Sequence, residues 1–79
     1  MEKTIRLRIN KELKKEYERK IMNLKGSLIS GGYTDIIHID DEDELHHINF
    51  FTTERRDEAL ELILTYIEQH TLAAVVILL

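Results

Sequence analysis

The chain contains no cysteine, which excludes disulfide bonds and thiolate metal sites. It also lacks a long apolar run. The longest, residues 72–79, is far shorter than the ~20 residues that a membrane-spanning helix needs. No apolar segment of the signal-peptide type follows the N-terminal residues. We therefore expect a cytoplasmic protein with no membrane partner.

The 79 residues are enough for one hydrophobic core, and we expect a single domain over residues 1–79. The composition, 43% hydrophobic and 33% charged, is typical of a folded globular chain and not of a disordered one. A chain of this length buries only roughly 60–65% of its unfolded surface. Close packing or self-association must therefore supply the remaining stability.

The net charge of −4 is distributed unevenly. Residues 1–25 carry nine basic and four acidic side chains, whereas residues 26–79 carry two basic and eleven acidic ones. Such asymmetry indicates either a basic binding surface or two segments that neutralise each other. We favour neutralisation, because the fold predicted below brings the acidic segment 40–44 close to Lys11, Lys14 and Lys15. Exposed ion pairs of this kind contribute little to stability individually.

Hydrophobic periodicity predicts four strands and two helices in the order β-α-β-β-α-β. The strands are expected at residues 4–9, 33–40, 45–52 and 73–79. Apolar residues spaced three and four apart predict a first helix that is capped by Asn10 and ends at Gly31-Gly32. A second helix is expected from Thr52-Thr53 to about His70. The two apolar stripes are Leu13, Tyr17, Ile21, Leu24 and Leu28, and Leu60, Ile63, Leu64 and Ile67.

This order of elements predicts an α+β fold, the ferredoxin-like βαββαβ two-layer sandwich. Two right-handed βαβ crossovers interleave to give a four-stranded antiparallel sheet in the order 4-1-3-2. Both helices then cover one face of the sheet, and the other face has no helix over it.

Strand alternation assigns side chains to the helix-free face. With a hairpin turn of about two to four residues, His38 lies opposite His47. The residues expected on this face are Arg6, Arg8, Ile36, His38, Leu45, His47, Asn49 and Phe51. The last strand is apolar throughout, so either Val75, Ile77 and Leu79 or Ala74, Val76 and Leu78 join them.

An apolar, helix-free face is typical of an interaction surface, and an uncharged edge strand is a template for pairing. We therefore predict a non-enzymatic protein-interaction or regulatory module that binds another protein chain, most simply as a homodimer. On the sheet face, the residues expected to bind are Arg6, Arg8, His38, His47, Asn49 and Phe51. On the last strand they are Val75, Val76, Ile77, Leu78 and Leu79.

Binding of single-stranded RNA is the alternative hypothesis, because RNA-recognition modules stack bases on an open sheet of this kind. Arg6, Arg8, His47, Asn49 and Phe51 have suitable chemistry. However, residues 45–52 do not match the RNP1 pattern, and the net negative charge opposes binding to phosphates.

We predict no catalytic residue, cofactor or metal site. Both serines, Ser27 and Ser30, belong to the first helix, and Gly31-Gly32 follows a helix, unlike the glycines of a phosphate loop. His38 and His47, with Asp40 or Asp43, would suit a divalent ion only if the hairpin register placed both histidines on one face. We interpret them as surface histidines.

Overall fold

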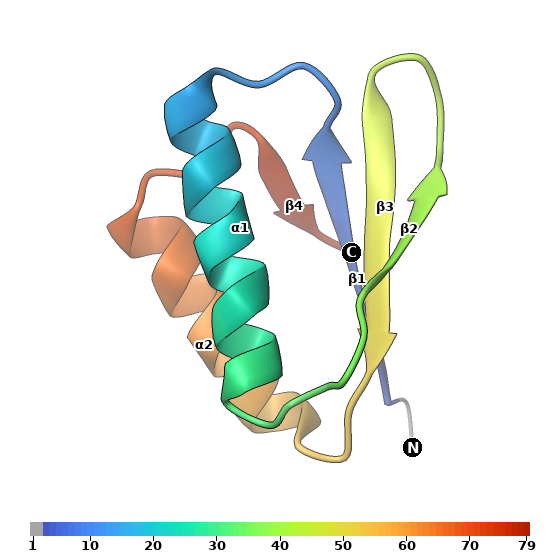
Figure 1. Ribbon diagram of the computed structural model, residues 1–79, viewed down its shortest axis with the longest axis vertical. Coiled ribbons are helices and arrows are strands. Elements are labelled where there is room, and N and C mark those ends of the chain that lie inside the picture. The colour runs from blue at the N-terminus through green and yellow to red at the C-terminus, as the bar shows by residue number, and fades with distance from the viewer. Residues whose placement is uncertain (1–2) are drawn as a thin grey trace.

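The computed structural model describes residues 3–79 and confirms the predicted order of elements (Figure 1). The strands are β1 (Thr4–Asn10), β2 (His38–Asp41), β3 (His46–Thr52) and β4 (Val76–Leu78), and the helices are α1 (Lys15–Ser30) and α2 (Arg56–Gln69). The four strands form one antiparallel sheet in the order β2-β3-β1-β4. Figure 1 shows both helices on the same side of this sheet, which is the predicted ferredoxin-like α+β arrangement. Within residues 3–79, neither helix is long and apolar enough to cross a membrane.

The hydrophobic core lies between the sheet and the two helices. The alternation of β1 buries Ile5, Leu7 and Ile9, as predicted. The other buried apolar residues are Ile21, Leu24 and Leu28 from α1, Ala59, Ile63 and Ile67 from α2, and Phe51, Leu72 and Val76. Full burial of one large apolar side chain contributes about 1.5–3 kcal/mol. This shared layer therefore holds α1 and α2 against the sheet.

Helix α1 begins later than predicted, at Lys15. Asn10 does not cap it but ends β1, because its N–H donates to Val75 O at 3.1 Å. The next residue, Lys11, donates its N–H to Leu45 O at 2.8 Å. Sheet pairing thus extends the strand through the residue that local preference would have used as a helix cap.

Helix α2 begins at Arg56, and its stripe differs from the prediction. Thr53 is buried, and its Oγ1 accepts a hydrogen bond from the Arg55 N–H at 3.1 Å, so Thr53 stabilises the turn before the helix. Leu64, which was expected in the core, is exposed, while Ala59 is fully buried. The buried face of α2 is therefore formed by residues at spacings of four.

Strands β2 and β4 are shorter than predicted, because the residues before each form turns. Before β2, the Tyr33 N–H donates to Leu28 O, and the Thr34 hydroxyl donates to the carbonyl of Ile36. Before β4, the N–H groups of Val75 and Val76 both donate to Leu72 O. These local bonds occupy backbone groups that an extended strand would offer to its neighbour.

Candidate interaction surface on the helix-free face

The register of β3 decides which side chains lie on the helix-free face. Phe51 pairs with Ile5, Asn49 with Leu7 and His47 with Ile9. Directly paired residues share a face of the sheet, so these β3 residues face the helices. Asn49 and Phe51 are 3% and 1% exposed. The prediction that His47, Asn49 and Phe51 lie on the helix-free face was therefore wrong.

The cause is the β2–β3 turn. His38 pairs with Phe50 and not with His47, so the register differs from the expected one by three residues. An odd shift turns every side chain to the opposite face. The Asp43 Oδ1 accepts hydrogen bonds from the N–H groups of Leu45 and His46, both at 2.8 Å, and this keeps Leu45 in the turn. Ile36 likewise lies outside the strands.

Two rows of side chains cross the helix-free face from β2 to β4. Each row has one residue from each of β2, β3 and β1 and ends at β4 or just beyond it, because the pairing of neighbouring strands is continuous across the sheet. The Leu79 N–H donates to Arg6 O, which places Leu79 beside Arg6 just beyond β4. The rows are His38, Phe50, Arg6 and Leu79, and Asp40, Ile48, Arg8 and Ile77. Arg6, Arg8 and His38 thus lie on the predicted face.

The last strand divides between the two faces. Val76 and Leu78 pair with Ile9 and Leu7 and therefore face the helices. Ile77 is on the helix-free face and is 46% exposed, and Leu79 is 52% exposed. Val75 is half-buried in the turn before β4.

In the row that contains Asp40, the β1 residue Arg8 forms an ion pair. Arg8 donates to Glu42, which follows β2, from Nε at 2.6 Å and from Nη2 at 2.9 Å. These bonds hold the pKa of the Glu42 carboxyl below its ordinary value and raise the pKa of Arg8. Asp40, in the same row, is exposed and has no ion-pair partner among residues 3–79.

The other row combines an aromatic pair with a cation. The His38 ring stacks on Phe50 with 5.1 Å between ring centres. Arg6 is opposite Phe50 on β1, is exposed, and forms no ion pair within the described part of the chain. A guanidinium without a partner beside aromatic and aliphatic side chains is available to bind a carboxylate, a phosphate or a planar ring.

Part of this face is hollowed, with a volume of about 560 Å³. The hollow is lined by Arg6, Asp40, Asp41, Glu42, Ile48, Phe50 and Leu79. Apolar side chains of β3 therefore lie between acidic residues at the β2 edge and a basic residue of β1.

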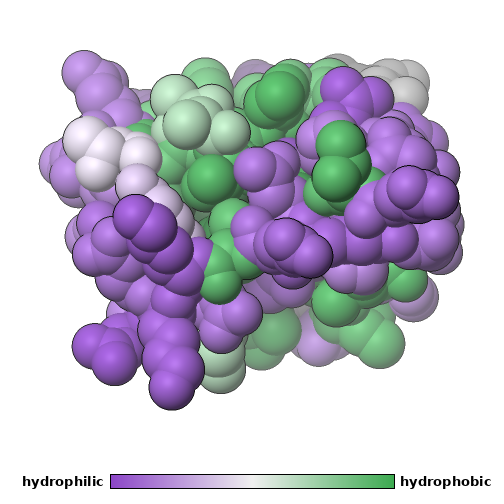
Figure 2. All heavy atoms as spheres, turned by 90° about the horizontal axis from the view of Figure 1, so that it is seen from above, coloured by the Kyte–Doolittle hydropathy of each residue, from purple (hydrophilic) through white to green (hydrophobic). Residues whose placement is uncertain are grey.

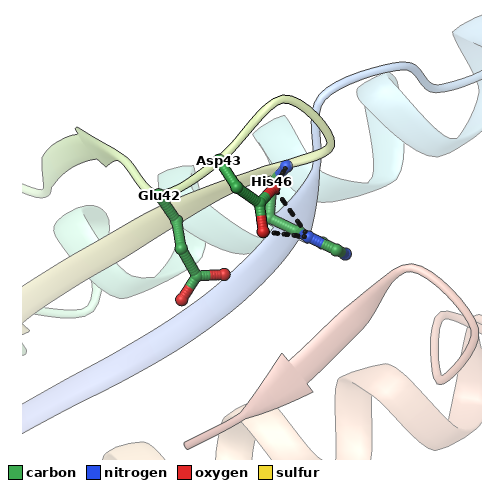
Figure 3. A group of neighbouring side chains, drawn as sticks. All are labelled: Glu42, Asp43 and His46. Atoms are coloured by element: carbon green, nitrogen blue, oxygen red, sulfur yellow. Dashed lines mark hydrogen bonds and ion pairs between the residues drawn. The ribbon is translucent and has the colours of Figure 1, made fainter.

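Glu42, Asp43 and His46 cluster in the β2–β3 turn, and their potential ligand atoms lie within 4.8 Å of one another (Figure 3). Figure 3 shows the Asp43 carboxylate directed at the His46 ring, whose Nδ1 lies 3.1 Å from Asp43 Oδ1. The hydrogen bonds from Leu45 and His46 hold the pKa of Asp43 below its ordinary value. Glu42 is bound by Arg8. Protein groups alone therefore account for this cluster.

The metal site that would have joined His38 to His47 is contradicted by the register. His38 pairs with Phe50 on the helix-free face, while His47 pairs with Ile9 and faces the helices. The sheet lies between the two imidazoles, so they cannot coordinate one ion.

The acidic turn and the β1–α1 loop lie at the same end of the molecule (Figure 1), and one of the three lysines expected near the turn contacts it. Lys11 forms an ion pair with Asp41, and His47 Nδ1 lies 4.0 Å from Asp41 Oδ1. Figure 2 views the molecule from this end and shows mostly hydrophilic side chains, with apolar ones in the middle of the view. Lys14 and Lys15 form no ion pair within residues 3–79.

Comparisons with protein-family models, with curated proteins and with solved structures gave no match for this chain. Any functional assignment therefore depends on the chemistry of the surface itself.

Proposed function

We propose that this protein is a non-enzymatic interaction or regulatory module that binds another protein chain through the helix-free face of its sheet. Self-association into a homodimer is the simplest form of this function, and the proposal keeps the cytoplasmic location expected from the sequence. It is supported chiefly by one observation: on the helix-free face, Ile48 and Phe50 of β3 and Ile77 and Leu79 at β4 lie on either side of Arg6 and Arg8 of β1. A surface that combines apolar side chains with arginine is typical of a protein-binding site, because arginine and aromatic residues are enriched in protein interfaces.

The edge of β4 supports the proposal less than the face does. Two backbone bonds join this segment to β1: Asn10 N–H donates to Val75 O, and Leu79 N–H donates to Arg6 O. Residues 75, 77 and 79 therefore direct their N–H and C=O groups toward β1. The N–H groups of Val76 and Leu78 therefore point to the free edge, but the Val76 N–H already donates to Leu72 O. A strand with so few free groups is a poor template for pairing.

The other edge of the sheet, β2, carries Asp40 and Asp41. Acidic residues on an edge strand oppose the addition of another strand. We therefore favour association through the face over association through either edge.

Light scattering combined with size-exclusion chromatography tests the proposal. The wild-type chain is expected to form a species heavier than the 9.4 kDa monomer at micromolar concentrations. Ile48→Gln should shift it toward the monomer, because Ile48 belongs to the proposed surface. The matched control is Leu64→Gln, since Leu64 is 51% exposed but lies on α2, on the other side of the molecule. A wild-type chain that stays monomeric at high micromolar concentration contradicts the self-association.

Binding of single-stranded RNA remains a second candidate, and the observed register gives it one specific support. Phe50, with His38 stacked on it, lies on the open face of a central strand beside Arg6. Bases stack on such aromatic platforms, and arginine contacts the backbone or the base plane. The acidic residues of β2 oppose phosphates, so we place this function second.

Fluorescence anisotropy of a labelled single-stranded RNA at low salt tests this candidate. We expect binding by the wild-type chain that is weakened by Arg6→Ala and by Phe50→Ala. Lys3→Ala, on the exposed Lys3 that pairs with Glu54, is the control for a loss of one positive charge. No change in anisotropy with the wild-type chain excludes the candidate.

A further inference from the structure

Two unpaired charges of opposite sign remain on the helix-free face. Arg6 and Asp40 have no ion-pair partner among residues 3–79. The neighbouring charges do have partners: Arg8 is bound by Glu42, and Asp41 by Lys11. The face therefore presents one cation and one anion that no side chain of residues 3–79 neutralises.

Arg6 and Asp40 are kept apart by the strand between them. Arg6 is on β1 opposite Phe50, and Asp40 is on β2 opposite Ile48, so β3 separates them. Adjacent strands are about 4.8 Å apart, which puts the two backbones roughly 10 Å from each other across β3. Each charge instead points away from the sheet, on either side of the apolar side chains Ile48 and Phe50.

This arrangement is self-complementary under a twofold rotation. In an isologous dimer, if residue i of one copy contacts residue j of the other, then j of the first copy contacts i of the second. A twofold axis that runs along β3, between two facing sheets, exchanges the β1 side with the β2 side. It brings Arg6 of each copy over the β2 side of the other, opposite His38 and one row away from Asp40, and it packs Ile48 and Phe50 on their counterparts. Arg8, which is opposite Asp40 in this arrangement, is already held by Glu42 of its own copy.

We propose that two copies of this chain pack their helix-free faces together about such an axis, with Arg6 of each copy paired with Asp40 of the other. This inference rests on the proposed function and names its partner as a second copy. Facing sheets pack about 10 Å apart and within about 30° of parallel. The two rows are offset by roughly 7 Å along the strands, a distance that the long arginine side chain spans.

Charge reversal with mixing tests the pairing directly. In Arg6→Asp, each introduced Asp faces Asp40 of the other copy, and in Asp40→Arg two arginines face each other. Each variant alone should dissociate at least about tenfold more readily than the wild type in sedimentation equilibrium. A mixture of the two variants restores both pairs, so the heterodimer should form with nearly the wild-type dissociation constant.

The matched control is Arg19→Asp, which makes the same charge change at an exposed position of α1. It should leave the dissociation constant within about twofold of the wild type, apart from the general effect of net charge. Circular dichroism of every variant verifies the fold, because both reversed residues are exposed and lie outside the core.

The outcomes separate this inference from the proposed function. If the wild type dimerises and Ile48→Gln weakens it, but charge reversal has no effect or mixing does not restore association, the Arg6–Asp40 pairing is wrong and the interaction surface stands. If the wild type is monomeric at high micromolar concentration, the twofold dimer is overturned along with self-association. Binding of RNA by that monomer would assign the face to nucleic acid.

Discussion

Arg8 and Glu42 form a bidentate ion pair that joins β1 to the beginning of the β2–β3 turn across the intervening strand β3. The Nε–Oε1 distance is 2.6 Å and the Nη2–Oε2 distance is 2.9 Å. A planar guanidinium that holds both carboxylate oxygens fixes orientation more firmly than a single contact does. This pair therefore helps to set the position of the turn that determines the register of β3.

Lowering the pH should destabilise the folded protein, in part because two carboxyl groups of this turn become protonated. The pKa of Glu42 is lowered by its hydrogen bonds with Arg8, and that of Asp43 by the Leu45 N–H and by His46. A carboxyl whose pKa is lower in the folded state stabilises the fold above its unfolded value, about 4, and this contribution disappears as the pH falls through the folded value. Urea unfolding between about pH 6 and pH 2.5 should therefore show a decreasing free energy of unfolding.

In Glu42→Gln, that decrease should be smaller, because one of the carboxyl groups responsible is gone. Glu61→Gln serves as the control, since Glu61 is exposed on α2 and has no ion pair within residues 3–79. Identical pH profiles for the wild type and Glu42→Gln would mean that the Arg8 pair does not stabilise the fold.

Asn49 should be replaceable by an apolar residue without loss of stability. It is 3% exposed, and its Oδ1 has no hydrogen-bond partner among the described residues. A buried polar atom without a partner costs about 1–3 kcal/mol. We expect Asn49→Leu to keep or raise the free energy of unfolding in urea, whereas Phe51→Ala on the same strand face should lower it by about 3–5 kcal/mol. A loss above about 2 kcal/mol in Asn49→Leu would indicate that the amide has a structural role.

Replacement of glycine by alanine should change stability in opposite directions at Gly26 and Gly31, within and just after α1. A Cβ at Gly31 would lie 2.9 Å from both Tyr33 Cε2 and Ser27 O. Ser27 O belongs to the backbone of α1 and cannot move aside as a side chain can, and the Arg55 guanidinium lies 4.2 Å from the centre of the Tyr33 ring. A Cβ at Gly26 would meet nothing within 4 Å.

We expect Gly31→Ala to destabilise the protein by about 1–3 kcal/mol, because it overpacks a fixed contact. Gly26→Ala should stabilise it by about 0.5–1 kcal/mol, since alanine favours a helix interior. Melting temperatures from circular dichroism should shift in opposite directions. A shift of the same sign in both variants would show that the Tyr33 contact does not restrict position 31.

Thr53 should be sensitive to loss of its hydroxyl. Its Oγ1 accepts the Arg55 N–H at 3.1 Å, and the residue is 5% exposed. Thr53→Val keeps the shape but removes the acceptor, so we expect a loss of about 1–2 kcal/mol. Thr52→Val, at an exposed end of β3, is the control and should change stability by less than about 0.5 kcal/mol. Equal effects in urea unfolding would contradict a special role for Thr53.

The face of β1 was predictable because its two alternating sets of side chains differ in chemistry. Ile5, Leu7 and Ile9 are all apolar, while Arg6 and Arg8 are charged, so only one arrangement buries apolar surface. In β3, each of the two alternating sets contains an apolar residue: one set includes Ile48 and Phe50, and the other includes Phe51 beside the polar Asn49. The assumed turn length, which put His38 opposite His47, made the second set appear to be the outer one, although the structure buries Asn49 and Phe51.

The surface residues Phe50, Ile48 and Asp40 were missed for this reason. Alternation gave no signal for choosing between the two sets of β3, and no pattern in the sequence states the length of the turn. Hydrogen bonds between Asp43 and the backbone of Leu45 and His46 fix that length. Similarly, the start of α1 depended on the bond between Asn10 and Val75, which are far apart in the chain.

The sequence by itself determined the order of strands and helices, and through that order the sheet topology, because periodicity and helix-ending glycines act over a few neighbouring residues. Only the tertiary structure decided which side chains of β3 and β4 lie on the helix-free face. The physical reason is that a shift of one residue in pairing reverses a strand, and the bonds that fix the shift join residues whose contact exists only in the folded chain.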